Sequence, residues 1–357
     1  GDAYGNDFSP YYYADGYWSN LFDASGDYFT IPASSDFNFG TGQFTIELFV
    51  YFTTSVGAGT LIGQSGFGSV LQLQSSGYFQ YYDINTASYL LTGGVTASKN
   101  TWTHVVVQRD ASNNLDLFIN GTRQATTTST ATLGFTNAQN LTIHSWNGNI
   151  SPNETYYSNI RIIKGSSVYT SGSSITVPTT PLTAVSGTEL LICQSNRFKD
   201  NSTTGRTITV SGDPEVSTNT PFTQTKTANV GSGFFDGTGD YLTATHATDF
   251  DFSGEFTAEC WFYLADAVNW GVLFCVDTGD RFQVAVTNSD TIDLRFNGGA
   301  TGTPFSINKN EWNHIAVTRD SSNVVQQFLN GVLKNTDTNT NSLDNGYMRI
   351  GANQNGS

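Results

Sequence analysis

The stretch that decides the fold runs from Thr101 to Thr126 and has the sequence TWTHVVVQRDASNNLDLFINGTRQAT. It recurs 210 residues later as EWNHIAVTRDSSNVVQQFLNGVLKNT, from Glu311 to Thr336. Trp, His, Arg-Asp and Asn-Gly stand in the same places in both copies. Two such copies indicate one structural module that occurs twice in the chain.

Each copy predicts a β-hairpin. Side chains of the first copy alternate between two faces with a period of two, with Trp102 and His104 on one face and Val105 and Val107 on the other. After a turn and a second strand, Asn120-Gly121 is the pair that most readily supplies two consecutive residues with positive φ. No helical period competes with this β pattern.

The composition is typical of an all-β, turn-rich chain of extracellular type, with 36 Gly, 13% aromatic and only 13% charged residues among 357. Asp and Glu number 30 against 15 Lys and Arg, which gives a formal net charge of −15. A surface of that sign repels phosphate backbones and anionic lipid. Nucleic acid is therefore a poor partner and a divalent cation a better one. No apolar run reaches the roughly 18 residues that a membrane helix needs, so membrane insertion is not expected.

The cysteines and histidines favour structural roles. Cys193, Cys260 and Cys275 do not occupy equivalent places in the two copies, so no shared disulfide framework is expected, and a Cys260–Cys275 bridge stays an open alternative. His104 and His314 recur at matched positions, each two residues after a Trp on the same face. That placement favours packed imidazoles over a ligand or a base.

Further segments of the two copies correspond. The Tyr-, Gly- and Asp-rich residues 1–20 have a counterpart in GDPEVSTNTPF, residues 212–222, with Pro10 and Pro221 separated by 211 residues. The segment FTIELFVYF, residues 44–52, places five apolar side chains on one face and Glu47 with two aromatics on the other. A strand of this kind is expected in the middle of a sheet, away from its edges.

The order FDGxGDYL, DFxFGxGxFTxExWxY, WxHVxVxRD and FxNGxxxxT resembles the laminin G-like family of concanavalin A-type jelly rolls, over nearly all of both copies. The resemblance implies two stacked antiparallel sheets per copy. We therefore expect an all-β fold with two antiparallel jelly-roll β-sandwiches in tandem, both truncated by the chain ends.

The same resemblance sets the expected domain boundary. Domains of the family usually open with a strand such as LLLHFDG, which Leu190 to Cys193 match here, so the boundary is placed near Ser186. The expected domains are residues 1–185, with opening strands absent, and residues 186–357, with closing strands absent.

A narrower resemblance concerns YYSNIRIIKGSSVYTS together with PTTPLTAVSGTELLICQSNRFKDNS. About fifty residues here are similar to tandem modules in large virion and tail proteins of marine bacteriophages, and to modules in surface proteins of aquatic bacteria. This similarity bears on localisation, which we expect to be a virion surface or extracellular.

Catalysis is not expected. Retaining glycoside hydrolases of this architecture carry closely spaced carboxylates of the form ExDxxE on one strand, because nucleophile and acid must flank one glycosidic bond. Glu47 and Glu259 are single carboxylates with no acidic neighbour two or four positions along.

Calcium is the expected cofactor, if any. Hard cations take several oxygen ligands from loops, and Asp23, Asp27, Asp236 and Asp240 lie in matching Gly-, Ser- and Thr-rich turns. The alternative is that these carboxylates cap backbone N–H groups in their turns.

Glycan binding is the other expectation, because exposed aromatic rings stack on sugar rings. Trp18, Trp146 and Trp270 lie in loop-like sequence and are the candidate ligand-binding residues. The whole pattern predicts a non-catalytic structural or adhesive segment of a virion fibre, tail or capsid-decoration protein, with cell-surface glycan and other modules of the same assembly as partners. The alternative is a bacterial extracellular adhesin or sheath protein that binds glycans or its own modules.

Overall fold

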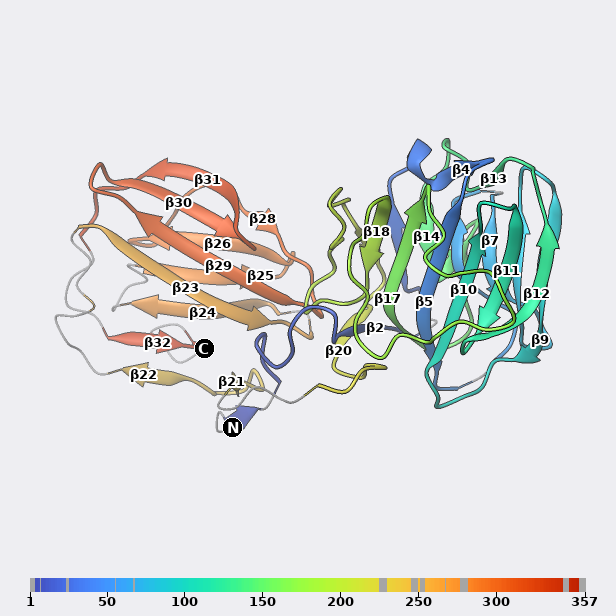
Figure 1. Ribbon diagram of the computed structural model, residues 1–357. Coiled ribbons are helices and arrows are strands. Elements are labelled where there is room, and N and C mark those ends of the chain that lie inside the picture. Colours follow the sequence, from blue (N-terminus) through green and yellow to red (C-terminus); the bar gives the residue numbers. More distant parts are fainter. Residues whose placement is uncertain are drawn as a thin grey trace. The chain divides into compact units, whose positions relative to one another are not determined.

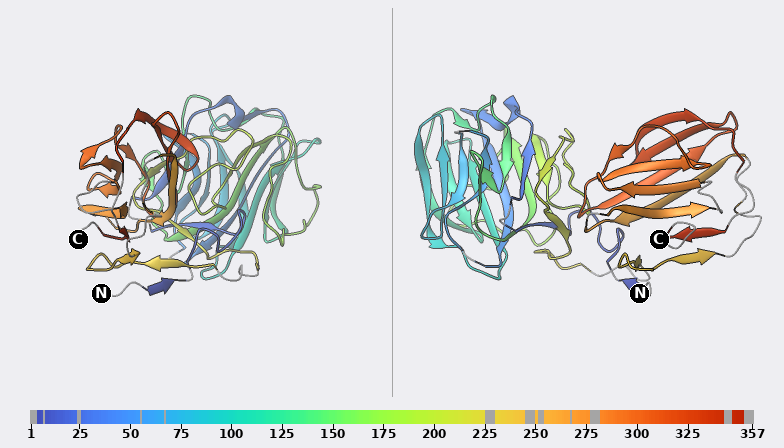
Figure 2. Two further views of the ribbon diagram at one scale, coloured as in Figure 1. Left: turned by 90° about the vertical axis from the view of Figure 1, so that its left-hand side faces the viewer. Right: turned by 180° about the vertical axis from the view of Figure 1, so that it is seen from behind.

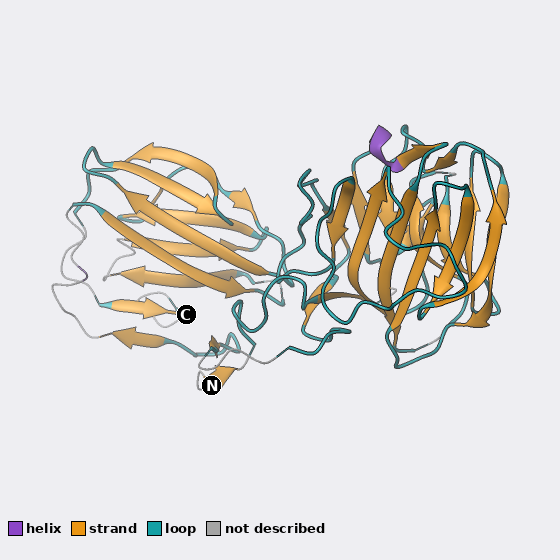
Figure 3. Cartoon of the chain, in the orientation of Figure 1, coloured by secondary structure: helices purple, strands orange, loops and turns teal. Residues whose placement is uncertain are grey.

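The computed structural model describes residues 4–6, 8–23, 26–54, 56–66, 68–224, 230–244, 250, 254–266, 268–276, 282–342 and 347–352. The chain divides into two compact units, residues 13–225 and residues 1–12 with 226–357, which we call sandwich 1 and sandwich 2. Strands and loops make up nearly all of the described part, which also contains a short 3-10 turn, η1 (Ser35–Phe37) (Figure 3). Within these residues no helix has the length and apolar character needed to cross a bilayer.

Sandwich 1 consists of two antiparallel sheets stacked face to face (Figures 1 and 2). Its first sheet has the order β12 (Thr122–Thr128), β11 (Asn114–Ile119), β10 (Thr103–Arg109), β5 (Phe44–Phe52), β17 (Thr155–Lys164), β2 (Ser19–Phe22) and β20 (Glu215–Ser217), with β18 (Thr188–Ile192) also paired to β17. Its second sheet has the order β19 (Thr209–Ser211), β3 (Tyr28–Ile31), β14 (Leu141–Ile143), β6 (Gly59–Gln64), β7 (Val70–Leu73), β8 (Tyr78–Asp83) and β9 (Ser88–Thr96). Two short pairs complete it, β4 (Asn38–Gly40) with β13 (Leu133–Gly134) and β15 (Ser145–Trp146) with β16 (Asn149–Ile150).

The strand pattern of residues 44–52 produces the expected central strand. β5 pairs with β10 on one side and β17 on the other. Its apolar face, Phe44, Ile46, Leu48, Val50 and Phe52, is completely buried. At about 25 cal/mol per Å² of apolar surface removed from water, such a strand is among the main sources of stability of sandwich 1.

Sandwich 2 repeats this arrangement over the strands that it contains. One sheet has the order β23 (Phe256–Tyr263), β29 (Trp312–Arg319), β30 (Val324–Leu329) and β31 (Val332–Thr338). The other has the order β22 (Leu242–Ala244), β32 (Met348–Ile350), β24 (Trp270–Val276), β25 (Phe282–Thr287), β26 (Thr291–Phe296) and β27 (Gly299–Ala300), with β28 (Phe305–Ser306) paired to β26. A further pair joins β1 (Tyr4–Asn6) to β21 (Ser232–Phe234).

The internal repeat is confirmed at the level of side chains. Trp102 packs on Tyr51 with ring centroids 5.5 Å apart, and Trp312 packs on Tyr263 with centroids 5.7 Å apart. Strand orders β12-β11-β10-β5 and β31-β30-β29-β23 correspond one to one. The all-β fold with two antiparallel β-sandwiches in tandem is therefore confirmed.

The division between the units differs from the boundary expected near Ser186. Strands β18, β19 and β20 all follow that residue, yet they pair with β17, β3 and β2 of sandwich 1. The segment that resembles the opening strand of a domain therefore closes the domain before it. Sandwich 1 is expected to lack its opening strands. Residues 188–217 instead supply it with three strands, β18, β19 and β20. In sandwich 2, β23 pairs with β29 alone among the described strands.

The cysteine alternatives also resolve. Cys193, Cys260 and Cys275 are all free thiols, and no Cys260–Cys275 bridge forms. Cys193 and Cys275 are buried and pack as small apolar side chains.

Candidate functional site

A surface pocket of about 270 Å³ lies on the outer side of the second sheet of sandwich 1. Its volume is slightly below the roughly 300–1,000 Å³ usual for small-molecule sites. Three aromatic side chains line it, Tyr82 on β8, Tyr89 on β9 and Trp146 on β15, and Gly68, Val70 and Ile84 complete the lining. None of these lining side chains is charged.

Strand periodicity and one short turn place the three rings. Tyr81 is completely buried in the core, so its neighbour Tyr82 faces outward, as alternation along β8 requires. Trp146 reaches the pocket on the β15–β16 hairpin, whose turn residues Asn147 and Gly148 have φ values of 49° and 76°. The hairpin lies close against β6 at Gly63. A Cβ added at Gly63 would be only 2.6 Å from the carbonyl oxygen of Ser145, so a larger residue there would push the hairpin away.

The pocket combines ring faces with hydroxyl groups. Tyr82 and Tyr89 form an edge-to-face pair with centroids 5.1 Å apart, and the Tyr89 side chain is 55% exposed. Gln72 Nε2 donates a hydrogen bond of 3.2 Å to the Tyr89 hydroxyl. Such a site can stack on an apolar ring face and exchange hydrogen bonds at its rim, and no carboxylate or imidazole lines it.

The three tryptophans predicted as ligand-binding residues have different environments. Trp146 lies in the pocket. Trp18 is completely buried, with its indole N–H donating to the Tyr13 carbonyl at 2.9 Å, so it has no ring face for an external ligand, contrary to expectation. Its loop-like sequence misled because Trp18 is buried in sandwich 1 although it directly follows an irregular segment with exposed residues.

Trp270 lies on β24 of sandwich 2 and is partly buried. The Arg295 guanidinium lies over its ring, 4.5 Å from the centroid, which covers one face. Sequence reasoning missed Tyr82 and Tyr89, although the alternation of YFQYYD around the core residue Tyr81 was a usable signal.

Among the described residues, the predicted metal ligands belong to an acidic loop cluster only in sandwich 1. Carboxylate oxygens of Asp23, Asp27 and Asp213 lie within 4.8 Å of one another. Asp27 is buried, and its two oxygens accept the backbone N–H groups of Asp23 at 3.0 Å and of Asp213 at 2.8 Å. Burial raises the pKa of Asp27 to about 6, and the charges of Asp23 and Asp213 act in the same direction.

The matching loop of sandwich 2 holds only the predicted pair. Asp240 accepts the backbone N–H of Asp236 at 3.0 Å, the same turn-capping contact that Asp27 makes with Asp23. Among the described residues no third acidic group joins Asp236 and Asp240 within ligating distance. Asp213 could not be predicted, because it follows β19, a strand that the sequence had assigned to the other module.

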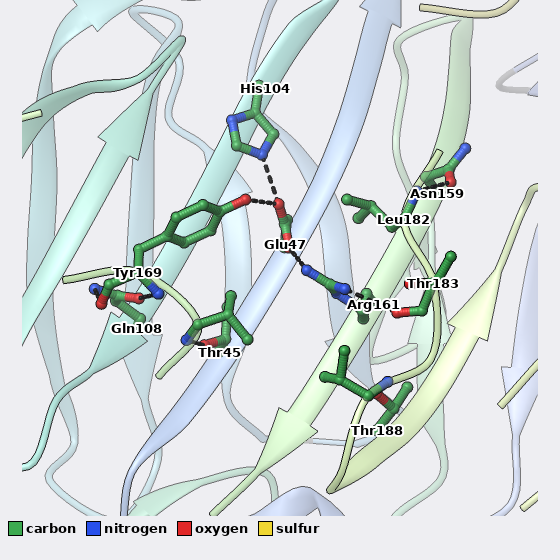
Figure 4. Close-up of polar contacts among 12 residues, drawn as sticks. Thr45, Glu47, His104, Gln108, Asn159, Arg161, Tyr169, Leu182, Thr183 and Thr188 are labelled. Carbon is green, nitrogen blue, oxygen red and sulfur yellow. Dashed lines mark hydrogen bonds and ion pairs between the residues drawn. The ribbon is translucent and has the colours of Figure 1, made fainter. Parts of the chain in front are cut away.

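Glu47 is the centre of a buried polar cluster on the face of the first sheet that points away from the core (Figure 4). It accepts hydrogen bonds from Arg161 Nη2 at 2.6 Å, from His104 Nε2 at 2.9 Å and from the Tyr169 hydroxyl. Burial opposes ionisation, but the bond from His104 and the charge of Arg161 outweigh it and hold the pKa of Glu47 below its usual value.

The Glu47 carboxylate is closed to ligands and to bulk water. Arg161 donates a second bond to the Thr183 carbonyl, and Thr183 and Tyr169 both belong to the loop after β17 that covers the cluster (Figure 4). A carboxylate with three donors and no exposed surface holds strands together and has no access to a substrate.

The equivalent pair in sandwich 2 is open. Glu259 lies 3.4 Å from His314, and its side chain is 59% exposed. It has no arginine partner in the described part of the chain, so the cluster seen in sandwich 1 is only half present there.

Fold and pocket together define a jelly-roll β-sandwich protein. The chain belongs to the concanavalin A-like lectin/glucanases superfamily, whose laminin G-like family model matches residues 23–166 and 236–357. A search of the curated proteins found no match.

Several solved structures resemble the chain. A Bacteroides ovatus protein proposed to bind carbohydrate is 16% identical, with a TM-score of 0.43, and the match covers 57% of this chain and 60% of that one. Domains LG4-5 of the mouse laminin alpha1 chain are 13% identical, with a TM-score of 0.34 and coverage of 96% and 84%. A Ruminococcus gnavus sialidase module, CBM40, bound to α2,3-sialyllactose is 15% identical, with a TM-score of 0.33 and coverage of 42% and 92%.

Proposed function

We propose that this chain is a non-catalytic glycan-binding segment and that sandwich 1 contacts the sugar through the pocket of Tyr82, Tyr89 and Trp146. The observation that carries this proposal is the grouping of three outward aromatic side chains around one uncharged surface hollow. Sugar rings present apolar C–H faces to aromatic rings and hydroxyls to amides and phenols, and the pocket offers both kinds of contact. No carboxylate, imidazole, amine or thiol lines it.

Binding is tested with a glycan array followed by calorimetry on the sugars that bind. Trp146→Ala removes a partly exposed ring from the pocket, and Tyr89→Ala removes the most exposed one, so each should weaken binding at least tenfold. Trp270→Ala is the matched control, since it deletes a partly buried tryptophan of sandwich 2 and should leave affinity unchanged. Unchanged binding by both pocket variants would place the sugar elsewhere and overturn the proposal.

Calcium is proposed as a structural ligand of the acidic loop cluster. Three carboxylates within 4.8 Å repel one another, and a hard divalent cation would neutralise that repulsion while taking the oxygen ligands it prefers. Asp27 would contribute from a fixed position, because two backbone N–H groups already orient it.

The calcium proposal predicts a rise in thermal midpoint on addition of millimolar Ca²⁺. Asp213→Asn should abolish that rise, whereas Asp240→Asn in the two-carboxylate loop of sandwich 2 should leave it intact. An equal response of both variants would show that calcium acts elsewhere.

For the biological setting, we propose a structural or adhesive element displayed on a virion, as part of a fibre, tail or capsid decoration. Support comes from the tandem repetition, which multiplies weak contacts by raising their effective concentration. The composition agrees with this setting, because only 13% of the residues are charged and the net charge is −15. The competing setting is a bacterial extracellular adhesin or sheath. Gold-labelled antibody imaging of particles and cells decides between them, since label on cell surfaces without particles would exclude the virion role.

A further inference from the structure

The two sandwiches have exchanged equivalent segments. β1, residues 4–6, precedes sandwich 1 in the sequence, yet it pairs with β21 of sandwich 2. β20, residues 215–217, precedes β21 in the sequence, yet it pairs with β2 of sandwich 1. Since β2 and β21 are equivalent strands of the repeat, each of them pairs with the segment that leads into the other sandwich. In Figure 1 the dark blue strand at the N label lies beside β21.

The pairing registers are the same in both sandwiches. Ser19 lies opposite Ser217, and its equivalent Ser232 lies opposite Asn6. Asn6 and Ser217 are therefore equivalent positions 211 residues apart, the spacing that also separates Pro10 from Pro221. We define the closing segment as residues 4–11 in one copy and 215–222 in the other, and the match concerns its described residues, 4–6 and 8–11 in the first copy.

Side-chain anchors follow the same spacing. Phe222 packs edge to face on Phe49 at 5.0 Å, and its equivalent Tyr11 packs edge to face on Trp261 at 6.0 Å. Trp261 Nε1 also donates a hydrogen bond of 2.8 Å to the Tyr11 hydroxyl. Phe49 and Trp261 are themselves equivalent residues of β5 and β23.

A second anchor lies three residues earlier. Asn219 accepts a hydrogen bond of 3.3 Å from Trp102 Nε1, while its equivalent Phe8 packs on the Trp312 ring at 5.4 Å. The Phe8 carbonyl also accepts the Ser232 hydroxyl at 2.6 Å. The strand register and both anchor positions are thus the same in the two sandwiches. We call the surface of each sandwich that contacts a closing segment its acceptor surface. The two acceptor surfaces therefore take the same type of closing segment.

We propose that the acceptor surface of sandwich 2, formed by the β21 edge with Trp261, Tyr263 and Trp312, also binds residues 4–11 of a second copy of this chain. The contacts needed are those that the segment makes within one copy, so exchange between copies creates no new interface and loses none. An edge strand paired by main-chain hydrogen bonds and held by aromatic anchors is a known means of joining separate chains. Repeated exchange would link copies head to tail without a linker.

Engineered cysteines test the pairing and the exchange separately. Gly5 and Gly233 lie directly opposite each other, so a chain carrying both Gly5→Cys and Gly233→Cys should form an internal disulfide on oxidation. A chain carrying Gly5→Cys and Asn20→Cys tests the unexchanged pairing and should not. Burial raises the pKa of the Cys260 thiol to about 12 and Cys193 and Cys275 are buried, so native thiols interfere little at pH 8.

For exchange between copies, full chains carrying Gly5→Cys alone and Gly233→Cys alone are mixed and oxidised. We expect a disulfide-linked dimer that grows with protein concentration and exceeds at least tenfold the dimer formed by Gly5→Cys with Val332→Cys, an exposed position on β31. Adding Tyr11→Ala to the Gly5→Cys chain should reduce the dimer severalfold. Dimer no greater than the Val332 control, or an internal Gly5–Asn20 disulfide in place of Gly5–Gly233, would overturn the proposal.

Discussion

Glu47 and Glu259 are the same residue of the repeat in two electrostatic environments. Glu47 is fully buried with Arg161, His104 and Tyr169 as donors, whereas Glu259 is mostly exposed beside His314. Removing one partner of a buried ion pair leaves an uncompensated charge, which costs about 3–5 kcal/mol. An exposed pair contributes about 0–1 kcal/mol.

Glu47→Gln is therefore expected to destabilise sandwich 1 by about 3–5 kcal/mol, because Arg161 stays buried without its counter-ion. Glu259→Gln, the matched change, should alter the stability of sandwich 2 by less than about 1 kcal/mol. Denaturant unfolding of both variants measures the two values. Similar losses at the two sites would contradict the difference in burial and partners.

His144 makes the stability of sandwich 1 depend on pH. Burial lowers its pKa from 6.5 to about 3, so the folded chain keeps the imidazole neutral where the unfolded chain binds a proton. The unfolding free energy should accordingly be fully retained above pH 6.5 and fall as pH drops toward 3. The total effect is about 5 kcal/mol, because the pKa falls from 6.5 to about 3 and each pKa unit corresponds to about 1.4 kcal/mol.

His144→Asn removes this titration and keeps a residue type that tolerates the φ of 69° found there. Denaturant midpoints at pH 7 and pH 4 should differ less in the variant than in the native chain. Asp27 acts in the opposite direction, because its raised pKa makes stability fall as pH rises from about 4 to about 6. If the variant and the native chain lost stability equally on acidification, the cause would lie at another group.

At the level of single elements, the Asn-Gly pairs do more than turn the chain. Asn120 and Asn330 have φ values of 47° and 53°, as a tight hairpin requires. Their side-chain oxygens also accept the backbone N–H of His104 and of His314, each at 2.8 Å. The hairpin turn is thereby tied to the start of the neighbouring strand in both sandwiches.

Asn120→Gly keeps the positive φ and removes only the side-chain acceptor. We expect it to destabilise sandwich 1 by about 1–2 kcal/mol, the usual effect of a lost bond to a backbone donor. Asn120→Asp keeps an acceptor and should restore most of the loss. Unfolding midpoints of the two variants decide, and equal destabilisation would mean that turn geometry alone matters.

How far the sequence predicts an element depends on how local its causes are. The alternation in FTIELFVYF and the Asn-Gly turn gave β5 and the β11–β12 hairpin correctly, because side-chain period and φ preference act within a few residues. Trp18 and Asp213 were misjudged because their environment comes from distant chain segments. The partners of β18, β19 and β20 are distant in the same way, so the resemblance of residues 190–193 to an opening strand placed these strands in the wrong module.

At the scale of the whole molecule, the two sandwiches bury their strands to different extents. Phe29 of β3 is completely buried, whereas its equivalent Leu242 of β22 is 51% exposed. Less apolar surface is therefore removed from water per strand in sandwich 2, and we expect it to be the less stable unit.

Two unfolding transitions should follow, with sandwich 2 unfolding first, because each unit has its own core and unfolds cooperatively. Val107 and Val317 are equivalent, completely buried residues of β10 and β29. Variants at these two positions show which transition belongs to which sandwich. Truncating either to Ala should cost about 2 kcal/mol through lost burial and the cavity left behind. Val317→Ala should lower only the first calorimetric transition and Val107→Ala only the second. A single transition that both variants shift equally would show instead that the sandwiches unfold as one cooperative unit.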